Sequence, residues 1–249
     1  MAAVVATGCV ADPASKPPED PWMEVKVAVH VHSTSSHDAC DGKPRPAGAP
    51  DLQCARDLRD GICGARYDHI FLSDHDVHMA ETPWSELLTP LFEEGDAWIG
   101  GDDRLGLRIR CAGGHEAEVY PGAENDLMPV GLDRHPGNGL AVGSDALHAL
   151  YDRWGEANVQ AFREAGGVTF VNHAEQHTTE EIAGISVDGI EIYNIHATLN
   201  AILAGDASAG EISEFLRTDD GAADPDLLFL TLYKDNVEDL THWSTLSHT

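Results

Sequence analysis

The chain has 249 residues, and its 43 Asp and Glu outnumber its 15 Lys and Arg, which gives a formal net charge of −28. This charge excludes nucleic-acid binding through a broad basic surface, because that mode needs clustered Lys and Arg to displace counterions. No run approaches the roughly 18 to 20 apolar residues of a membrane-spanning helix. The length suits one α/β domain with a buried core, and the acidity fits a solvated surface.

The first residues resemble the end of a bacterial lipoprotein signal. Small residues from Val4 to Gly8 precede Cys9, which is then a candidate site for a lipid anchor. Only eight residues precede this Cys and none is basic, so either the front half of such a signal is missing or the similarity arises by chance. We predict that residues 1–23 are a truncated lipoprotein-like signal with a Pro-rich tether, in front of a folded domain over residues 24–249. This favours the bacterial cell envelope or periplasm, with the cytoplasm as the alternative.

Cysteine usage is compatible with both compartments. With Cys9 assigned to lipid, an even number remains, namely Cys40, Cys54, Cys63 and Cys111. Four cysteines can form two disulfides in an oxidising compartment, whereas in the cytoplasm they would be free thiols. No Cys-x-x-Cys pair is present, which makes a zinc ribbon a weak interpretation.

The first predicted strand delivers two histidines. Valines alternate with other residues from 24 to 31, and a period of two predicts a strand. His30 and His32 fall at its end, and side chains two residues apart on a strand point to the same face. Residues 33–50 are rich in Ser, Asp, Gly and Pro and predict a loop.

The rest of the chain alternates between helix and strand patterns. Apolar residues recur at helical spacing from 146 to 165, with Ser144 or Asp145 as the N-cap and Gly166-Gly167 as the stop signal. The other expected elements are a helix over 51–65 ending at Gly61 or Gly64, a strand over 69–73, an excursion with a short helix over 81–104, one or two strands over 108–119, strands over 168–171, 185–195 and 227–233, a helix over 197–217, and a polar tail to Thr249. This alternation predicts parallel βαβ units and an α/β fold.

Metal-binding residue types recur where the predicted strands stop. Besides His30 and His32, the strand ends carry Asp74 and His75, Glu124, His173 and Glu191. Because the carboxyl ends of parallel strands meet at one rim, we expect a single cluster there. Imidazoles suit zinc, iron or manganese, and a carboxylate such as Glu124 can bridge two cations. The sequence therefore predicts a metal site.

These segments, in this order, resemble the PHP family, the polymerase and histidinol phosphatase superfamily of metal-dependent phosphoesterases. The resemblance covers Val25 to Asn194. Its motifs are His30-Val31-His32-Ser33 with Ser36-His37-Asp38, Leu72-Ser73-Asp74-His75-Asp76, Gly122-Ala123-Glu124-Asn125, Val171-Asn172-His173-Ala174, and Gly189-Ile190-Glu191-Ile192-Tyr193-Asn194.

The resemblance implies a PHP-type distorted (β/α)7 barrel over residues 24–249, incomplete at its C-terminal end. It implies two or three divalent ions (Zn, Mn or Fe) held by His30, His32, His37, His75, Glu124 and His173. A metal-bridged hydroxide would then attack a small-molecule phosphoester. His75 or His37 would protonate the leaving alcohol, and Arg134 is the expected phosphate-binding residue.

The chain departs from the family pattern at two points. The family closes its site with Asp-x-His in a Gly-Ser-Asp-x-His context, which does not follow Glu191 here, and His242 and His248 are the remaining substitutes. A further family histidine has His135 as its nearest counterpart. The alternatives to a phosphoesterase are an amidohydrolase-type enzyme acting on a carbonyl substrate, a catalytically impaired metal-binding surface protein, and a structural barrel with no metal.

Overall fold

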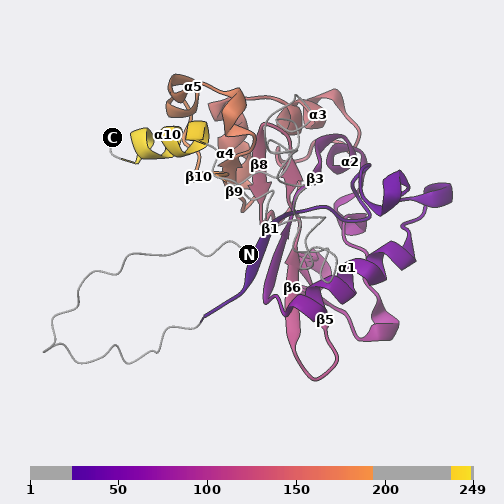
Figure 1. Cartoon of the computed structure of the whole chain (residues 1–249). Helices are drawn as coiled ribbons and strands as arrows, with labels where there is room; N and C mark the ends of the chain where they lie inside the picture. The colour runs from indigo at the N-terminus through magenta and orange to yellow at the C-terminus, as the bar shows by residue number, and fades with distance from the viewer. Residues whose placement is uncertain (1–23, 193–236, 248–249) are drawn as a thin grey trace, which may run out of the picture.

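A computed structural model describes residues 24–192 and 237–247 (Figure 1). The expected signal and tether, the helix over 197–217, the strand over 227–233 and His248 lie outside the described residues. The described part is a mixed α/β structure with three sheets, which confirms the α/β class. Within these two ranges the strands form no closed barrel. None of the described helices is long and apolar enough to cross a membrane.

The largest sheet contains the strand that carries His30. Its order is β1-β2-β6-β5-β4, with β1, β2 and β6 parallel and with β5 antiparallel to both neighbours. The strands are β1 (Val27–Val31), β2 (His69–Leu72), β4 (Ala97–Ile99), β5 (Gly106–Arg110) and β6 (Glu116–Tyr120). Of the one or two strands predicted over 108–119, two form, and they make the β5–β6 hairpin.

Two smaller sheets continue this arrangement. The chain resumes pairing after Ser73 and after Gly122, where β3 (Asp74–His75) lies parallel to β7 (Ala123–Glu124). The third sheet has the order β10-β9-β8, with β9 (Val168–Val171) parallel to β10 (Gly189–Ile190) and antiparallel to β8 (Leu127–Val130). Of the strand predicted over 185–195, only β10 forms within the described residues.

Helix α1 (Leu52–Ala65) begins as predicted but runs further than predicted. Asp51 caps it by accepting hydrogen bonds from the backbone amides of Gln53 and Cys54, and the helix ends where Arg66 adopts a left-handed conformation. It thus passes through Gly61 and Gly64, which were expected to end it. Each glycine costs about 1 kcal/mol relative to Ala, and burial of one helix face offsets that cost.

The helix predicted over 146–165 is in fact two helices. Ser144 caps α3 (Asp145–Asp152) through the amide of Leu147, which confirms one of the two expected caps. The chain then turns at Gly155, whose φ is +154°, into α4 (Glu156–Glu164). The Asn158 side chain donates to the carbonyls of Ala149 and Leu150 at 3.0 and 2.8 Å. This side chain satisfies carbonyls at the end of α3 that a continuous helix would have paired.

Several short elements were not predicted individually. Helix α2 (Asp76–Glu81) precedes an excursion of 3-10 turns and β4, and α5 (Thr179–Ala183) starts with a capping box between Thr178 and Glu181. The expected polar tail contains α10 (Val237–Leu246), which packs against α5 and the turn after His173. Figure 1 shows α10, in yellow, beside α5.

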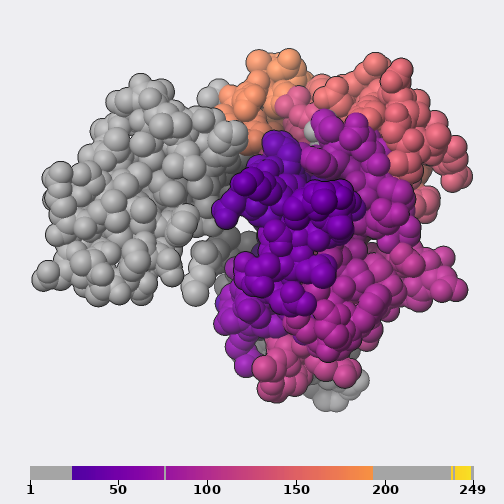
Figure 2. Space-filling model, turned by 90° about the vertical axis from the view of Figure 1, so that its right-hand side faces the viewer, coloured from indigo at the N-terminus to yellow at the C-terminus, as the bar shows by residue number. Residues whose placement is uncertain are grey.

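The core has two main parts. Buried residues of α1, β2, β5 and β6 form one cluster, and residues of α2, α3, α4 and β8 form the other. In Figure 2 the indigo and violet segments that follow β1 cover the centre of one face, between the magenta residues of the β5–β6 region and the orange residues near β9.

Two disulfides form among the four remaining cysteines. Cys40 pairs with Cys54 and Cys63 pairs with Cys111. The first joins the loop after β1 to α1, and the second joins α1 to the end of β5. Helix α1 is thus covalently fixed near both of its ends, and this arrangement matches the oxidising-compartment alternative.

Candidate metal centre

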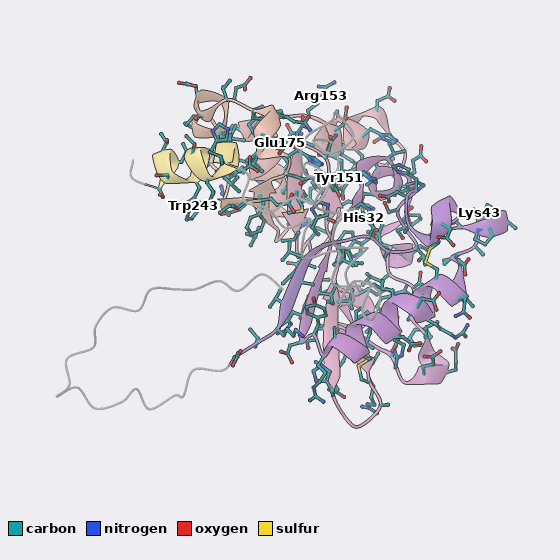
Figure 3. All side chains as sticks on the ribbon, viewed as in Figure 1. His32, Lys43, Tyr151, Arg153, Glu175 and Trp243 are labelled. Carbon is teal, nitrogen blue, oxygen red and sulfur yellow. A yellow bond between two sulfur atoms is a disulfide. The ribbon has the colours of Figure 1, made fainter. Side chains whose placement is uncertain are left out.

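The predicted ligands lie at the carboxyl ends of neighbouring strands. His30 and His32 come from β1, His75 from β3, Glu124 from β7 and His173 from the residue pair after β9. Figure 3 shows His32 between the lower sheet and the upper helices. Side chains do not alternate regularly along β1. The pairing of β1 with β2 shifts by a residue at His30, which has a φ of +68°. This bulge re-aims the His30 ring, which stacks on His32 at a centroid distance of 5.6 Å.

Glu124 is the centre of the first cluster. Its carboxylate oxygen Oε2 lies 2.8 Å from His30 Nε2 and 2.6 Å from His32 Nε2. Its other oxygen accepts a hydrogen bond from Asn172 Nδ2 at 2.8 Å and lies 3.4 Å from His173 Nε2. We call His30, His32, Glu124 and His173 the inner group. One buried carboxylate thus faces three imidazoles and an amide.

Gly122 explains how Glu124 reaches this position. A Cβ atom at residue 122 would overlap the carbonyl oxygens of Leu72 and Pro129. Only glycine lets the chain pass so close to β2 and β8, and the next two residues then pair with β3. The backbone approach therefore sets the depth of the Glu124 side chain.

A second cluster lies beside the first and shares His32. Asp38 accepts from His32 Nδ1 at 2.8 Å and lies 3.3 Å from His75 Nε2. We call His32, Asp38 and His75 the outer group. Ser36 Oγ donates to the same carboxylate at 2.6 Å. Since His32 uses Nε2 toward Glu124 and Nδ1 toward Asp38, its ring connects the two groups.

Asp74 fixes the backbone between the two groups. Its buried carboxylate accepts from the amide of Ser33 at 2.6 Å and from Ser33 Oγ at 2.7 Å. Burial raises the pKa of Asp74 to about 6, while the hydrogen bonds from Ser33 work in the opposite direction. The carboxylate therefore positions the residues after His32.

Electrostatics in the inner group favour positive charge. Burial disfavours a charged His30, but its hydrogen bonds with Glu124 and Glu191 outweigh burial and raise its pKa to about 10. Burial is likewise outweighed at His173, where Glu124 and Glu175 raise the pKa to about 9. Burial would raise the pKa of Glu124, yet hydrogen bonds with the three histidines hold it far below its ordinary value. The protonated imidazoles supply the positive charge that a cation would otherwise provide.

The remaining predicted residues lie outside both groups. The His37 ring is 4.4 Å from that of His75 and 6.0 Å from that of His78, so it extends the row of rings outward. Arg134 donates to the backbone carbonyl of Glu164, at the end of α4. His135 uses its two ring nitrogens for Tyr151 Oη and the carbonyl of Thr82, both at 2.9 Å.

His242 also serves a packing contact in the described residues. Its Nδ1 lies 2.8 Å from Thr179 Oγ1, which joins α10 to α5. The contact places α10 close to the segment after His173 but gives His242 no partner in the inner or outer group.

Three contributors were not among the predicted site residues. Asp38 follows His37 in the first motif, Asn172 precedes His173, and Glu191 was noted only as a strand end. The carboxylate of Glu191 lies 2.6 Å from His30 Nδ1. Adjacency to a predicted ligand was the signal for Asp38 and Asn172. Glu191 was marked by its strand end and by the last motif, but no local pattern indicated that it would contact His30.

The donor sets fit divalent metal ions. Within the part of the chain that the structure describes, His30, His32 and Glu124 bring three donor atoms within 4.8 Å of one another, as do His32, Asp38 and His75. Imidazole with carboxylate is the donor chemistry of zinc, iron and manganese sites. The Glu191 carboxylate at His30 Nδ1 also matches the partners that orient metal-binding imidazoles.

Comparisons with family models, with curated proteins and with solved structures gave no significant match to this chain.

Proposed function

We propose that the chain is a metal-dependent hydrolase of PHP type that cleaves a small-molecule phosphoester. The main support is the buried Glu124 carboxylate, placed among three imidazoles, two from the end of β1 and one from the turn after β9. A buried charge of this kind is costly unless it is paired, and a metal cluster is one way to use it. The PHP-type barrel is part of the same proposal, supported by site residues at the ends of five strands in one order along the chain.

The ligands would come from both groups. His30, His32, Glu124 and His173 would hold one ion, and Asp38 and His75 would hold a second together with His32, whose ring would have to lose its proton and act as an imidazolate to serve both. Zinc, manganese or iron are the matching metals. When bound, such ions act as Lewis acids and activate water for attack on an ester.

Other residues of the site would orient the ligands and transfer a proton. Asp74 and Asn172 orient the backbone after β1 and the Glu124 carboxylate through their hydrogen bonds. His37 lies outside both groups, beside His75. Its ring would therefore bind neither ion and would protonate the leaving alcohol. This assigns the acid role to His37 in preference to His75.

The test combines metal content with a substrate panel. We expect the purified chain to retain one or two ions by elemental analysis and to hydrolyse an aryl phosphate with added Mn²⁺ or Zn²⁺. Glu124→Gln should lower turnover by about 100-fold or more, and its metal content with it. Glu116→Gln, an exposed residue of a surface ion pair on β6, is the matched control and should change neither.

Other outcomes separate the alternatives. Turnover of an aryl ester or lactone with no phosphate hydrolysis would favour carbonyl chemistry. Retained metal with no hydrolysis of any ester would favour a binding protein, and a chain that retains no metal would contradict the metal site itself.

A further inference from the structure

We propose that Glu191 and Glu175 are positioning residues for the inner ion and make it the more tightly held of the two ions. They would act by holding the rings of His30 and His173 with Nε2 toward Glu124. The inference rests on the metal site of the proposed function, and it does not depend on which ester the chain hydrolyses.

The three histidines of the inner group face Glu124 through the same ring atom. Nε2 lies 2.8 Å from the Glu124 carboxylate in His30, 2.6 Å in His32 and 3.4 Å in His173. The other ring nitrogen, Nδ1, is therefore on the side of each ring that faces away from Glu124. A common orientation of this kind suits three nitrogen donors to one ion.

A second carboxylate lies behind two of these rings, at Nδ1. His30 Nδ1 lies 2.6 Å from Glu191 Oε1, and His173 Nδ1 lies 3.6 Å from Glu175 Oε1. An ionised carboxylate only accepts hydrogen bonds, so it favours a ring proton on Nδ1 and leaves Nε2 as the donor to a cation. Partners of this kind fix the ring orientation and increase the basicity of the ligand.

Both carboxylates are largely buried and are placed by the backbone. The side chain of Glu191 is 14% exposed and that of Glu175 is 20% exposed. Glu191 directly follows β10, and its amide continues the pairing with β9 by donating to the Val171 carbonyl at 2.9 Å. Glu175 lies in the 3-10 turn Ala174–Gln176, directly after His173. The two side chains therefore reach the rings from ordered positions, which reduces the cost of orienting them.

The same two histidines have an unusual backbone conformation. The φ of His30 is +68° and that of His173 is +51°, in the left-handed region that residues other than glycine seldom adopt. Such conformations persist where the surrounding contacts hold them. Carboxylates on both sides of each ring, Glu124 at Nε2 and Glu191 or Glu175 at Nδ1, provide contacts of that kind.

The outer group lacks this arrangement at its own histidine. His75 Nε2 lies 3.3 Å from Asp38, and among the described residues no carboxylate lies within ion-pair distance of His75 Nδ1. Asp38 is 43% exposed and also accepts from His32 Nδ1, so it is shared between two rings. An ion in the outer group would therefore be held less firmly and exchange more readily than the inner ion.

Titration of the metal-free full chain with Zn²⁺ against a chromophoric chelator tests the proposal without any turnover. We expect a tight step and a weaker step in the wild type. Glu191→Ala should weaken the tight step by about tenfold or more, and Glu175→Ala should weaken it less because its contact is longer. Glu81→Ala is the control, because its carboxylate lies 3.9 Å from His148, outside both groups, and it should change neither step. Two equal steps in the wild type, or an unchanged tight step in Glu191→Ala, would overturn the proposal.

A conservative variant separates positioning from a general loss of structure. Glu191→Gln keeps an oxygen that accepts from His30 Nδ1, so it should restore most of the affinity that Glu191→Ala loses. Nitrogen-15 NMR of the zinc-loaded chain should show His30 protonated at Nδ1 in the wild type and in Glu191→Gln, and a changed signal in Glu191→Ala. If Glu191→Ala does not fold, Glu191→Asp takes its place, because its shorter side chain withdraws the carboxylate from Nδ1.

The remaining outcomes are distinguishable. A Glu191→Gln variant that binds as weakly as Glu191→Ala would overturn the positioning role. A wild-type chain that binds no Zn²⁺ would contradict the metal site itself. Tight binding with hydrolysis of no ester would contradict only the proposed hydrolase, and the titration then still decides the role of Glu191.

Discussion

The inner and outer groups use the same residue types but differ in how the chain holds them. The Glu124 side chain is 6% exposed and comes from a strand, whereas the Asp38 side chain is 43% exposed and comes from a loop. Strand positions fix the inner group through the sheets themselves. The outer group depends on a loop held by Ser33, Ser36 and a disulfide. One shared residue, His32, joins a part of the site held by strands to a part held partly by a loop.

The largest expected effect is the loss of that shared residue. His32→Ala should remove ligands from both groups and lower the affinity for both ions by about 100-fold or more, whereas His75→Ala should affect only the outer ion. Elemental analysis after dialysis against a weak chelator, at one and two equivalents of metal, measures the difference. If His75→Ala removes both ions, the two groups are a single site.

Loss of either disulfide should have an effect of intermediate size. One loss should mainly reduce stability, and the other should mainly reduce metal affinity. Cys40–Cys54 closes 14 residues and Cys63–Cys111 closes 48, so loss of the second should cost more stability, roughly 4 against 3 kcal/mol. Of the two disulfides, the first is the one that anchors the loop carrying Asp38. Cys40→Ser/Cys54→Ser should therefore weaken outer-ion affinity by about tenfold, and Cys63→Ser/Cys111→Ser should unfold earlier in urea with that affinity intact.

The smallest effect is the pH dependence of the metal-free protein. The raised pKa values of His30, about 10, and His173, about 9, stabilise the fold fully below pH 6.5, and this stabilisation is lost as pH rises through those values. The lowered pKa of Glu124 has the opposite sense, since its stabilisation is present above pH 4.5 and is lost on acidification. Asp38 has a pKa lowered to about 2, so its own titration does not contribute to the loss of stability at alkaline pH.

Thermal unfolding after chelation should therefore show a Tm that falls by several degrees from pH 7 to 10. Bound metal requires neutral imidazoles, so the stabilisation by added Zn²⁺ should grow over the same range. Glu124→Gln removes one of the two carboxylates that raise each of these pKa values, since Glu191 still faces His30 and Glu175 still faces His173, and it should reduce the alkaline decline of the metal-free protein. A decline of unchanged size in this variant would place the titrating groups elsewhere.

The strand ends were predictable because local patterns decide them. Alternating valines mark β1, compact apolar runs mark β2 and β9, and each run stops at a metal-binding residue. Parallel strands then bring those stops to one rim without further information. This is why His30, His32, Glu124 and His173 were found from the sequence.

The unpredicted features depend on contacts between distant segments. Helix α1 passes its two glycines because Cys54 and Cys63 tie it to other elements and Ile62 is buried against the sheet. The helix break at Gly155 is stabilised by Asn158, whose acceptors belong to the preceding helix. The pairing of Glu191 with His30 joins residues 161 positions apart. No local pattern carries these partners, although the capping box of α5 could have been read as Thr-x-x-Glu.

The left-handed backbone at His30 has an energetic consequence. An L-residue in that conformation costs about 1 to 2 kcal/mol, and glycine or asparagine would occupy the position with less strain. The side chain needed for metal chemistry is therefore one that the local backbone disfavours. Glycine or asparagine here would relieve the backbone strain but would leave the buried Glu124 carboxylate without one of its ion pairs. The contacts of His30 with Glu124 and Glu191 therefore hold the residue in a conformation that its own backbone disfavours.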